Sequence, residues 1–174
     1  MKIKIKLLDL ACTIEPNKKG EWIDLRARYN SWLAGPQVEI LSKPKGQNNP
    51  IASVITTSTL LSLGVSMKLP KYFEANILPR SSTFSSFGII MANGMGIVDS
   101  TYCGNLDEWK FNALVIKDSH IEAGDRIAQF RIRPSQFAPW WVKLKWLFVN
   151  KIEFDYVEDL KNPTRGGFGS TGLK

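Results

Sequence analysis

Short apolar or alternating runs, each closed by turn residues, recur along the whole chain. Residues 2–6 read KIKIK, an alternation with the period of two that a half-buried strand has. Turn signals such as Asn93-Gly94 and Gly124-Asp125 separate the runs. The runs with strand character are residues 2–8, 22–28, 54–63, 65–69, 72–78, 88–91, 96–99, 112–117, 126–132, 142–149 and 152–157. Many short strands at fairly even spacing predict an all-β sandwich or barrel.

Helical periodicity is nearly absent, and a short helix is predicted only at residues 81–86. The segment 140–146 reads WWVKLKW, and its basic and aromatic residues could bind a single-stranded nucleic acid. Its apolar residues alternate with lysines, however, so a half-buried strand with a solvated face is the better prediction. The longest surface loop is predicted at residues 42–50.

Size and composition are those of one globular domain covering residues 1–174, with 44% hydrophobic and 22% charged residues. No apolar run is long enough to span a membrane. Cys12 and Cys103 form neither a close pair nor a framework, which predicts free thiols in a reducing, cytoplasmic location. The net charge of +7 leaves open a nucleic-acid partner, an anionic small substrate, or solubility alone.

The glycine-rich segment 91–104, MANGMGIVDSTYCG, carries the strongest indication of a functional site. Its glycines let backbone or ligand approach closely because no Cβ stands in the way. The apolar pair Ile97 and Val98 predicts a short buried strand, so Asp99 would lie where that strand leaves the core, with Tyr102 three residues later.

The run RGGFGSTG at residues 165–172 combines a cation, an aromatic ring and two hydroxyls with glycines. Together with the segment 91–104 it indicates a site for a phosphorylated, planar ligand. The run lacks the Gly-Lys-Ser/Thr of a Walker loop. Its composition fits a mobile flap over residues 162–174 that orders on its ligand, or else a disordered terminus.

Three further segments hold candidate residues, each with an ordinary structural alternative. In PRSS, residues 79–82, an arginine suits phosphate and two serines supply hydroxyls, but taken alone the motif favours a helix cap with a surface arginine. In AGDRIAQF, residues 123–130, Gln129 could donate to a phosphate or to metal-bound water, or could lie on an exposed strand face. In GEWIDLRA, residues 20–27, Asp24 either points outward or faces a site.

The single histidine, His120, limits the chemistry that the chain can perform. It has no second histidine and no clustered cysteines for a zinc site, so it is predicted to be a surface residue. Nor does any Ser-His-Asp or Cys-His arrangement have the histidine that it needs.

Taken in order, these segments resemble the five motifs of the trimeric dUTPase family, whose members hydrolyse dUTP to dUMP and pyrophosphate. GEWIDLRA is similar to the first motif, PRSS to the second, NGMGIVDSTYCG to the third, GDRIAQF to the fourth and RGGFGSTG to the fifth. The resemblance implies a jelly-roll-like distorted β-barrel that assembles as a homotrimer. It further implies active sites shared between subunits, closed by the tail, and a requirement for Mg²⁺ but for neither nucleic acid nor membrane.

The resemblance also assigns roles by position. Asp99 would be the catalytic residue, which orients and deprotonates the water that attacks the α-phosphorus. Tyr102 would pack under the deoxyribose, and Asp24 would hold Mg²⁺ through water, as suits a hard cation that rides mainly on the phosphates. The uracil reader would be Asn93 with the backbone of Gly96, Ile97 and Val98. The phosphate contacts would be Arg80, Ser81, Ser82, Gln129 and Arg165, and the tail would add Phe168 on the uracil with Gly169, Ser170 and Thr171 around the phosphates.

The sequence departs from the family pattern at three places. Arg165 stands three residues before Phe168 instead of the usual five, and Pro163 occupies the usual position. Ile23 precedes Asp24 where an aromatic residue is common. Thr101 stands where an acidic or amide residue is common.

Other functions remain open at this point. A dCTP deaminase of the same fold would need a glutamate in the strand after motif three, and residues 111–117, FNALVIK, contain no acid. A regulatory protein on the same scaffold, switched by nucleotide, would have no need of Asp99. A nucleic-acid-binding β-barrel would explain the net charge, but not Asp99, Tyr102 and the tail together.

Overall fold

The computed structural model describes residues 1–15, 20–42, 51–149 and 151–167. Its strands are β1 (Lys2–Leu7), β2 (Ile23–Arg26), β3 (Ser31–Leu33), β4 (Gln37–Ser42), β5 (Ile51–Ile55), β6 (Ser58–Ser62), β7 (Val65–Lys68), β8 (Phe73–Pro79), β9 (Ile89–Met91), β10 (Gly96–Asp99), β11 (Lys110–Val115), β12 (Ser119–Ile121), β13 (Arg126–Pro134) and β14 (Glu153–Tyr156). The helices are α1 (Thr83–Phe87), α2 (Trp140–Trp146) and a 3₁₀ turn, η1 (Leu10–Cys12). The all-β prediction is confirmed.

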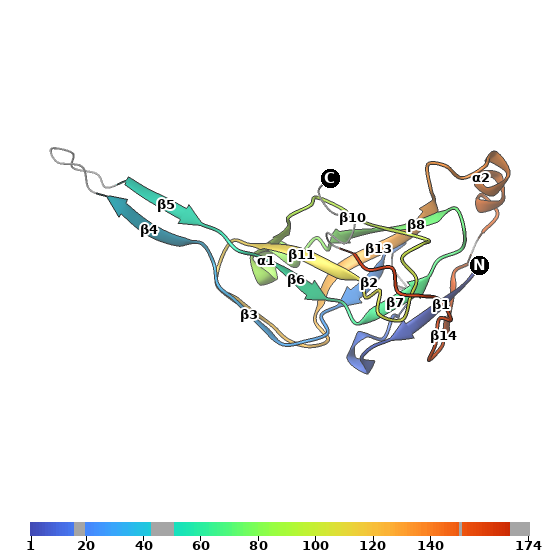
Figure 1. Ribbon diagram of the computed structural model, residues 1–174, viewed down its shortest axis with the longest axis horizontal. Helices are drawn as coiled ribbons and strands as arrows, with labels where there is room; N and C mark the ends of the chain where they lie inside the picture. Colours follow the sequence, from blue (N-terminus) through green and yellow to red (C-terminus); the bar gives the residue numbers. More distant parts are fainter. Residues whose placement is uncertain (16–19, 43–50, 150, 168–174) are drawn as a thin grey trace.

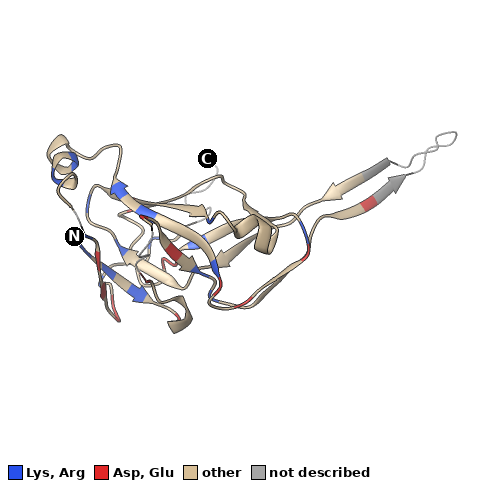
Figure 2. Ribbon diagram, turned by 180° about the vertical axis from the view of Figure 1, so that it is seen from behind, with Lys and Arg blue, Asp and Glu red and all other residues tan. Residues whose placement is uncertain are grey.

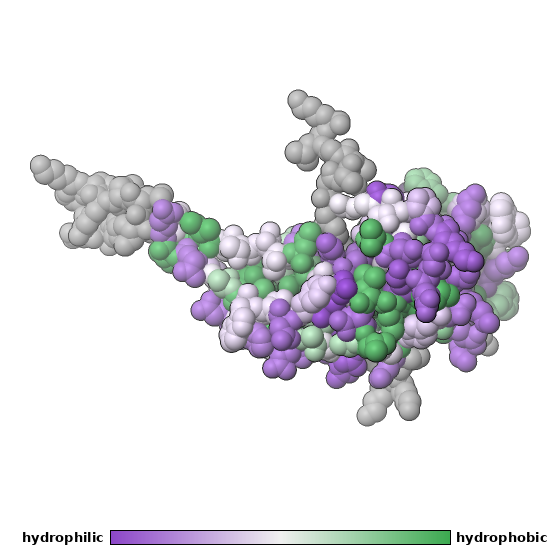
Figure 3. All heavy atoms as spheres, turned by 60° about the horizontal axis from the view of Figure 1, so that its bottom comes forward, coloured by the Kyte–Doolittle hydropathy of each residue, from purple (hydrophilic) through white to green (hydrophobic). Residues whose placement is uncertain are grey.

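An antiparallel sheet in the order β10-β8-β13-β2 lies at the centre of the body (Figure 1). A second sheet, β14-β1-β7, pairs β14 in parallel with β1, and a third has the order β6-β11-β9. The hairpin of β4 and β5 projects from one end of the body, and α2 lies at the other end (Figure 1). The hairpin carries exposed apolar side chains, including the directly paired Val38 and Val54 (Figure 3).

Alternation along the strands builds the core. In β1 the side chains of Ile3 and Ile5 are fully buried while Lys2 and Lys4 are exposed, as the period of two predicts. The long strand β13 contributes Phe130, whose ring meets Trp109 edge to face at 5.2 Å between centroids. β13 pairs with both β8 and β2, so its buried side chains hold together the sheet whose edge strands, β10 and β2, carry Asp99 and Asp24.

The short helix after Pro79 is confirmed, two residues later than predicted, as α1. It ends at Gly88, which has φ of +59°, and whose N–H donates to the carbonyl of Phe84 at 2.8 Å. A left-handed glycine of this kind is a common helix end. The buried side chain of Thr83 donates to the carbonyl of Ile127 at 2.9 Å, which fastens α1 to β13.

The predicted strand at residues 142–149 is wrong, because α2 occupies most of that segment. Pro139 immediately precedes the helix, and a proline with fixed φ favours a helix start. Val142 and Trp146, four residues apart, share one helical face, and Trp146 packs edge-on against Phe73 at 5.4 Å. Leu144, predicted to be buried with them, is 48% exposed. Residues 142–146 alternate as a strand does, but the four-residue spacing of Val142 and Trp146 also fits one face of a helix, and the helix is what forms.

Other predictions differ at the boundaries. The strands β3, β4 and β12 were not predicted. The predicted run 54–63 contains the last residues of β5 and the whole of β6. The loop predicted at residues 42–50 lies almost wholly outside the described residues. Lysines and arginines are interspersed with acidic residues over the body rather than gathered on one face (Figure 2).

Cys12 and Cys103 are free thiols, as predicted. His120 is partly exposed and stacks on the ring of Trp32 at 4.2 Å between centroids. None of the helices in the described parts of the chain has the length and apolar character needed to cross a bilayer.

Candidate functional site

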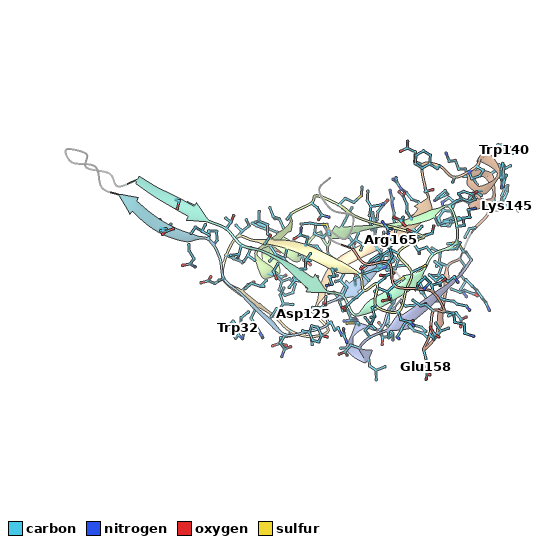
Figure 4. The ribbon with its side chains drawn as sticks, viewed as in Figure 1. Trp32, Asp125, Trp140, Lys145, Glu158 and Arg165 are labelled. Atoms are coloured by element: carbon cyan, nitrogen blue, oxygen red, sulfur yellow. The ribbon has the colours of Figure 1, made fainter. Side chains whose placement is uncertain are left out.

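A cavity of about 240 Å³ opens between β10 and the last described residues of the chain. Its walls come from β8, from the segment 93–102, from the beginning of β11 and from residues 165–167. Arg165 projects over the middle of the body, far from Trp140 and Lys145 on α2 (Figure 4). The cavity therefore joins the glycine-rich segment to the start of the tail.

The strand β10 is positioned by antiparallel pairing with β8, in which Gly96 faces Ile77 and Asp99 faces Glu74. Val98 packs into the core, while Ile97 on the other face of the strand is 60% exposed and lines the cavity. The turn before β10 places Gly94 at φ of +68°, and the side chain of Asn93 donates to the carbonyl of Met95 at 3.2 Å. Asn93, Gly96, Ile97 and Val98 all line the cavity.

Asp99 lies at the end of β10 with its carboxylate held by two neighbours. It accepts hydrogen bonds from the backbone N–H of Thr101 at 2.7 Å and from the Thr101 hydroxyl at 2.5 Å. Nη1 of Arg165 donates to its two oxygens at 3.0 and 2.8 Å. Burial tends to raise the pKa of Asp99, but the hydrogen bonds from Thr101 and Arg165 outweigh it and lower the pKa. The carboxylate is therefore ionised at neutral pH.

Tyr102 forms a fixed aromatic wall of the cavity. Its hydroxyl donates to the carbonyl of Glu108 at 3.0 Å, and its ring lies against Gly167, where any Cβ would press on the ring. Burial raises the pKa of Tyr102, and the carboxylates of Asp107 and Glu108 raise it further. The phenol is therefore uncharged at neutral pH, and the hydrogen bond from its hydroxyl to Glu108 fixes the position of the ring.

Asp107 connects this wall to the tail. Its side chain is fully buried and accepts N–H groups from Gly104 at 2.7 Å, from Arg165 at 3.0 Å to each oxygen, and from Gly166 at 3.0 Å. Burial tends to raise the pKa of Asp107, but the backbone donors outweigh it and lower the pKa. The carboxylate is thus charged and buried, and its hydrogen bonds offset the free-energy cost of burying the charge.

The remaining candidates form a second cluster across β2, β8 and β13. Asp24 accepts from Nε of Arg80 at 2.8 Å and from Nη1 of Arg126 at 3.1 Å. Gln129 stands opposite Asp24 in the sheet register and donates to the carbonyl of Pro79 at 3.1 Å. This cluster brings together the candidates of GEWIDLRA, PRSS and AGDRIAQF.

Ser81 and Ser82 lie beside the second cluster, directly after Arg80. Ser81 is exposed. Ser82 immediately precedes α1, and its side chain makes no capping hydrogen bond to the helix. Both hydroxyls therefore remain available at the start of α1.

Asp99 and Asp24 lie on opposite edges of the central sheet. Asp99 is on β10 and Asp24 on β2, with β8 and β13 between them. At about 4.8 Å per strand, three steps separate the edges by roughly 14 Å. The structure brings Asp99, Tyr102 and Arg165 together in one cavity, and leaves Asp24, Arg80, Ser81, Ser82 and Gln129 outside it.

The described residues fit a divalent ion carried by a ligand better than one held by the protein. Both oxygens of Asp24 already accept hydrogen bonds from arginines. In the parts of the chain that the structure covers, no three His, Cys, Asp or Glu side chains are grouped as a metal site. Mg²⁺ keeps several waters and is commonly bound through phosphates with one or two carboxylates. Asp24 could reach such an ion through water.

Sequence reasoning missed several residues at the cavity. The hydroxyl of Thr101 fixes Asp99, and the backbone N–H of Thr101 closes a turn on the same carboxylate, of the kind that an Asp in a turn segment favours. Glu108, Trp109 and Lys110 line the wall, and Glu108 is itself engaged by the N–H of Gly64 at 2.9 Å. The tail candidates Phe168, Gly169, Ser170 and Thr171 lie outside the described residues.

Comparison with known proteins agrees with the motif pattern. The dUTPase family model matches residues 47–136. The SPbeta prophage-derived deoxyuridine 5′-triphosphate nucleotidohydrolase YosS of Bacillus subtilis (strain 168) is 39% identical over 175 residues, covering 100% of both chains. The deoxyuridine 5′-triphosphate nucleotidohydrolase of Maricaulis maris (strain MCS10) is 32% identical over 180 residues, covering 99% of this chain and 97% of the relative.

Solved structures share the fold at low sequence identity. The dUTPase from Streptococcus mutans superposes with a TM-score of 0.60 at 15% identity, covering 78% of this chain and 98% of the other. A point mutant of Staphylococcus bacteriophage 80alpha dUTPase, with dUpNHpp, superposes with a TM-score of 0.57 at 17% identity over 98% of both chains. These likenesses concern the fold alone.

Proposed function

The chain belongs to the dUTPase family, and we propose that the cavity beside β10 is its active site, with Asp99 as the base. The protein is a dUTP diphosphatase, which hydrolyses dUTP to dUMP and pyrophosphate. The observation that carries the assignment is the placement of Asp99. It is an ionised carboxylate held by Thr101 and Arg165 in a cavity that Tyr102 and Asn93 also line.

Asp99 orients a water molecule toward the α-phosphorus and takes its proton. A carboxylate with a lowered pKa is ionised and so can accept a proton at neutral pH, and the backbone N–H and the hydroxyl of Thr101 limit its rotation. Phosphoryl transfer needs little covalent help from the protein, so positioning of the water and neutralisation of the phosphates supply most of the catalysis.

Asn93 and the backbone of Gly96, Ile97 and Val98 read the uracil ring, while Tyr102 packs under the deoxyribose. Support comes from the rigid position of Tyr102, whose hydroxyl bond to Glu108 prevents its ring from moving aside for a 2′-hydroxyl. Discrimination against ribose and thymine is then steric. Discrimination against cytosine depends on hydrogen bonds that the wrong base leaves unmade.

The complete site forms between subunits of a homotrimer. One subunit supplies Arg80, Ser81 and Ser82 after β8 and Gln129 on β13 to the triphosphate that lies at the β10 edge of its neighbour. Support comes from the roughly 14 Å between Asp24 on β2 and Asp99 on β10 within one chain, and from the position of Arg80, Ser81, Ser82 and Gln129 outside the lining of the cavity. Head-to-tail contacts of this kind close into a ring when the rotation between neighbours divides a full turn, as a threefold rotation does.

Asp24 would hold Mg²⁺ through a water, with the ion carried mainly by the substrate's phosphates. The pairing of Asp24 with Arg80 and Arg126 supports this, because it orients the carboxylate without leaving it free for direct coordination. When bound, the ion neutralises charge that develops on the leaving pyrophosphate.

The flap of residues 162–174 covers the nucleotide from its attachment at Asp107, with Arg165 on the γ-phosphate, Phe168 on the uracil and Gly169, Ser170 and Thr171 around the phosphates. The whole chain forms one domain, and its free thiols support a cytoplasmic location. Neither a membrane nor a nucleic acid takes part in the reaction.

The assignment is tested by pyrophosphate release with Mg²⁺ from dUTP, dCTP, dTTP and UTP in parallel. We expect turnover of dUTP alone, abolished by Asp99→Asn with nucleotide binding retained and unchanged in the matched control Asp155→Asn. Normal turnover by Asp99→Asn would refute its role as base. Release from several nucleotides would refute the roles of Asn93 and Tyr102. Binding of dUTP without release would favour the regulatory alternative.

A further inference from the structure

We propose that Asp107 is the positioning residue of this active site, holding the backbone of Arg165 so that its guanidinium can exchange between Asp99 and the substrate's triphosphate. The proposal rests on the function assigned above. It concerns the free enzyme as well as the complex, because the contacts between Asp107 and Arg165 involve the chain alone.

The first step is that Asp107 binds the backbone of the tail and leaves the guanidinium of Arg165 to other partners. Its two oxygens accept the N–H groups of Arg165 and Gly166, 58 and 59 residues further along the chain. The N–H of Gly104 completes the set, and the N–H of Asp107 itself donates to the carbonyl of Gly104 at 3.1 Å. A buried carboxylate with this many donors is held firmly, because each lost bond would leave buried charge unsatisfied.

The second step is that the surrounding loop is shaped to receive the tail. A Cβ at Gly104 would collide with the backbone of Thr164, and Gly166 has φ of +78°. Asn105 makes a parallel attachment upstream, accepting the N–H of Leu160 at 2.9 Å and donating to Asp159 at 2.7 Å. The loop of Gly104, Asn105 and Asp107, here called the clamp, therefore fixes the tail at two points before Gly167.

The third step concerns the side chain of Arg165, which is less constrained than its backbone. Its guanidinium pairs with Asp99 and donates to the Thr101 hydroxyl at 2.6 Å, yet the Arg165 and Asp99 side chains are 42% and 51% exposed. Ion pairs between groups this exposed contribute little, so the exchange costs little. A triphosphate offers more negative charge and accepts the planar fork in two parallel bonds.

The exchange couples substrate binding to the activation of the base. When Arg165 turns to the phosphates, Asp99 loses a donor to its ionised form, so its pKa rises and it becomes a stronger base. The other charges near Asp99 are Lys110 and Glu108 across the cavity and Glu74 on β8, the last of which is paired with Arg133 at 2.9 Å.

Amide hydrogen exchange tests the clamp without relying on activity. We expect the amides of Arg165 and Gly166 to be protected in the wild-type protein without nucleotide. Asp107→Ala should remove that protection, Asp107→Asn should weaken it, and Asp155→Asn should leave it intact. Protection in β1 and β14 should persist in all three variants.

Steady-state kinetics with dUTP and Mg²⁺ then separate positioning from general stability. We expect KM to rise about tenfold or more in Asp107→Ala, as for the loss of hydrogen bonds to a charged group, with a smaller fall in kcat. A purely structural role would reduce the active fraction and hence kcat, leaving KM unchanged, and would overturn the proposal.

A measurement on the wild-type protein keeps the proposal testable if Asp107→Ala does not fold. Amide exchange is compared with and without dUpNHpp as the probe. Equal protection of Arg165 and Gly166 in both states supports a preformed anchor, and protection only with dUpNHpp refutes it. Failure of the wild-type protein to hydrolyse dUTP would refute the proposed function and leave this exchange result standing.

Discussion

Thr101→Val offers a direct test of how Asp99 is prepared for catalysis. The substitution keeps the backbone N–H that donates to Asp99 at 2.7 Å and the approximate volume of the side chain, but removes the hydroxyl that donates at 2.5 Å. A hydrogen bond to a charged group is worth roughly 1.5–3 kcal/mol. Because the Asp99 side chain is 51% exposed, water replaces part of it, and we expect a cost of about 1 kcal/mol. The loosened carboxylate positions the attacking water less well, and we expect this to lower kcat/KM approximately fivefold even though the base itself becomes slightly stronger.

The pH dependence of the same variant has a definite sign. The hydroxyl stabilises the ionised form of Asp99 and helps to lower its pKa, so its removal raises that pKa. The acid limb of the kcat/KM profile for dUTP therefore moves to higher pH, and the loss of rate is greater in acid than near pH 8. Thr101→Ser keeps the hydroxyl and is the matched control. An unchanged acid limb in Thr101→Val, or equal effects of Ser and Val, would refute this account.

Three further outcomes are expected. Gly104→Ala should displace the tail, because its Cβ would meet the backbone of Thr164. We expect KM for dUTP to rise while the unfolding temperature changes little, and an unchanged KM would contradict the close approach. Phe130→Ala should lower the free energy of unfolding by about 3–5 kcal/mol, since it empties a fully buried site against Trp109, as measured in urea with an exposed-strand substitution as control. Burial raises the pKa of Cys12 to about 11, so this thiol should resist a disulfide reagent at pH 8 until the protein is unfolded, and rapid reaction in the folded protein would refute its burial.

The alternation of apolar and polar residues predicted the strands well where one face of the strand is buried and the other is exposed to solvent. In β1 the alternation of Lys and Ile translates directly into exposed and buried side chains, because successive residues of a strand point to opposite faces. The same pattern failed at α2, where the alternation is too short to exclude a helix. Packing of Trp146 against Phe73 on another element decided the outcome there. The irregular strands β3 and β12 carry no such pattern and were missed.

For the active site, the sequence alone determined the residue types and their order along the chain: Asp99 after a buried strand, Tyr102 three residues later, and a glycine-rich tail. These are local signals, because glycine density and apolar runs are visible without any partner. The sheet order was not visible, so only the tertiary structure separated the cluster of Asp24 from that of Asp99.

Only the tertiary structure could give Asp107 its role. In the sequence it is one acid in a polar loop, and its neighbours do not distinguish it from a solvated surface residue. Its burial arises when the backbone of Arg165, 58 residues away, supplies the donors that a buried carboxylate requires. The sequence specifies which chemical groups the side chains carry. The burial and hydrogen-bond partners that set the function of each group depend on which distant parts of the backbone the fold brings beside it.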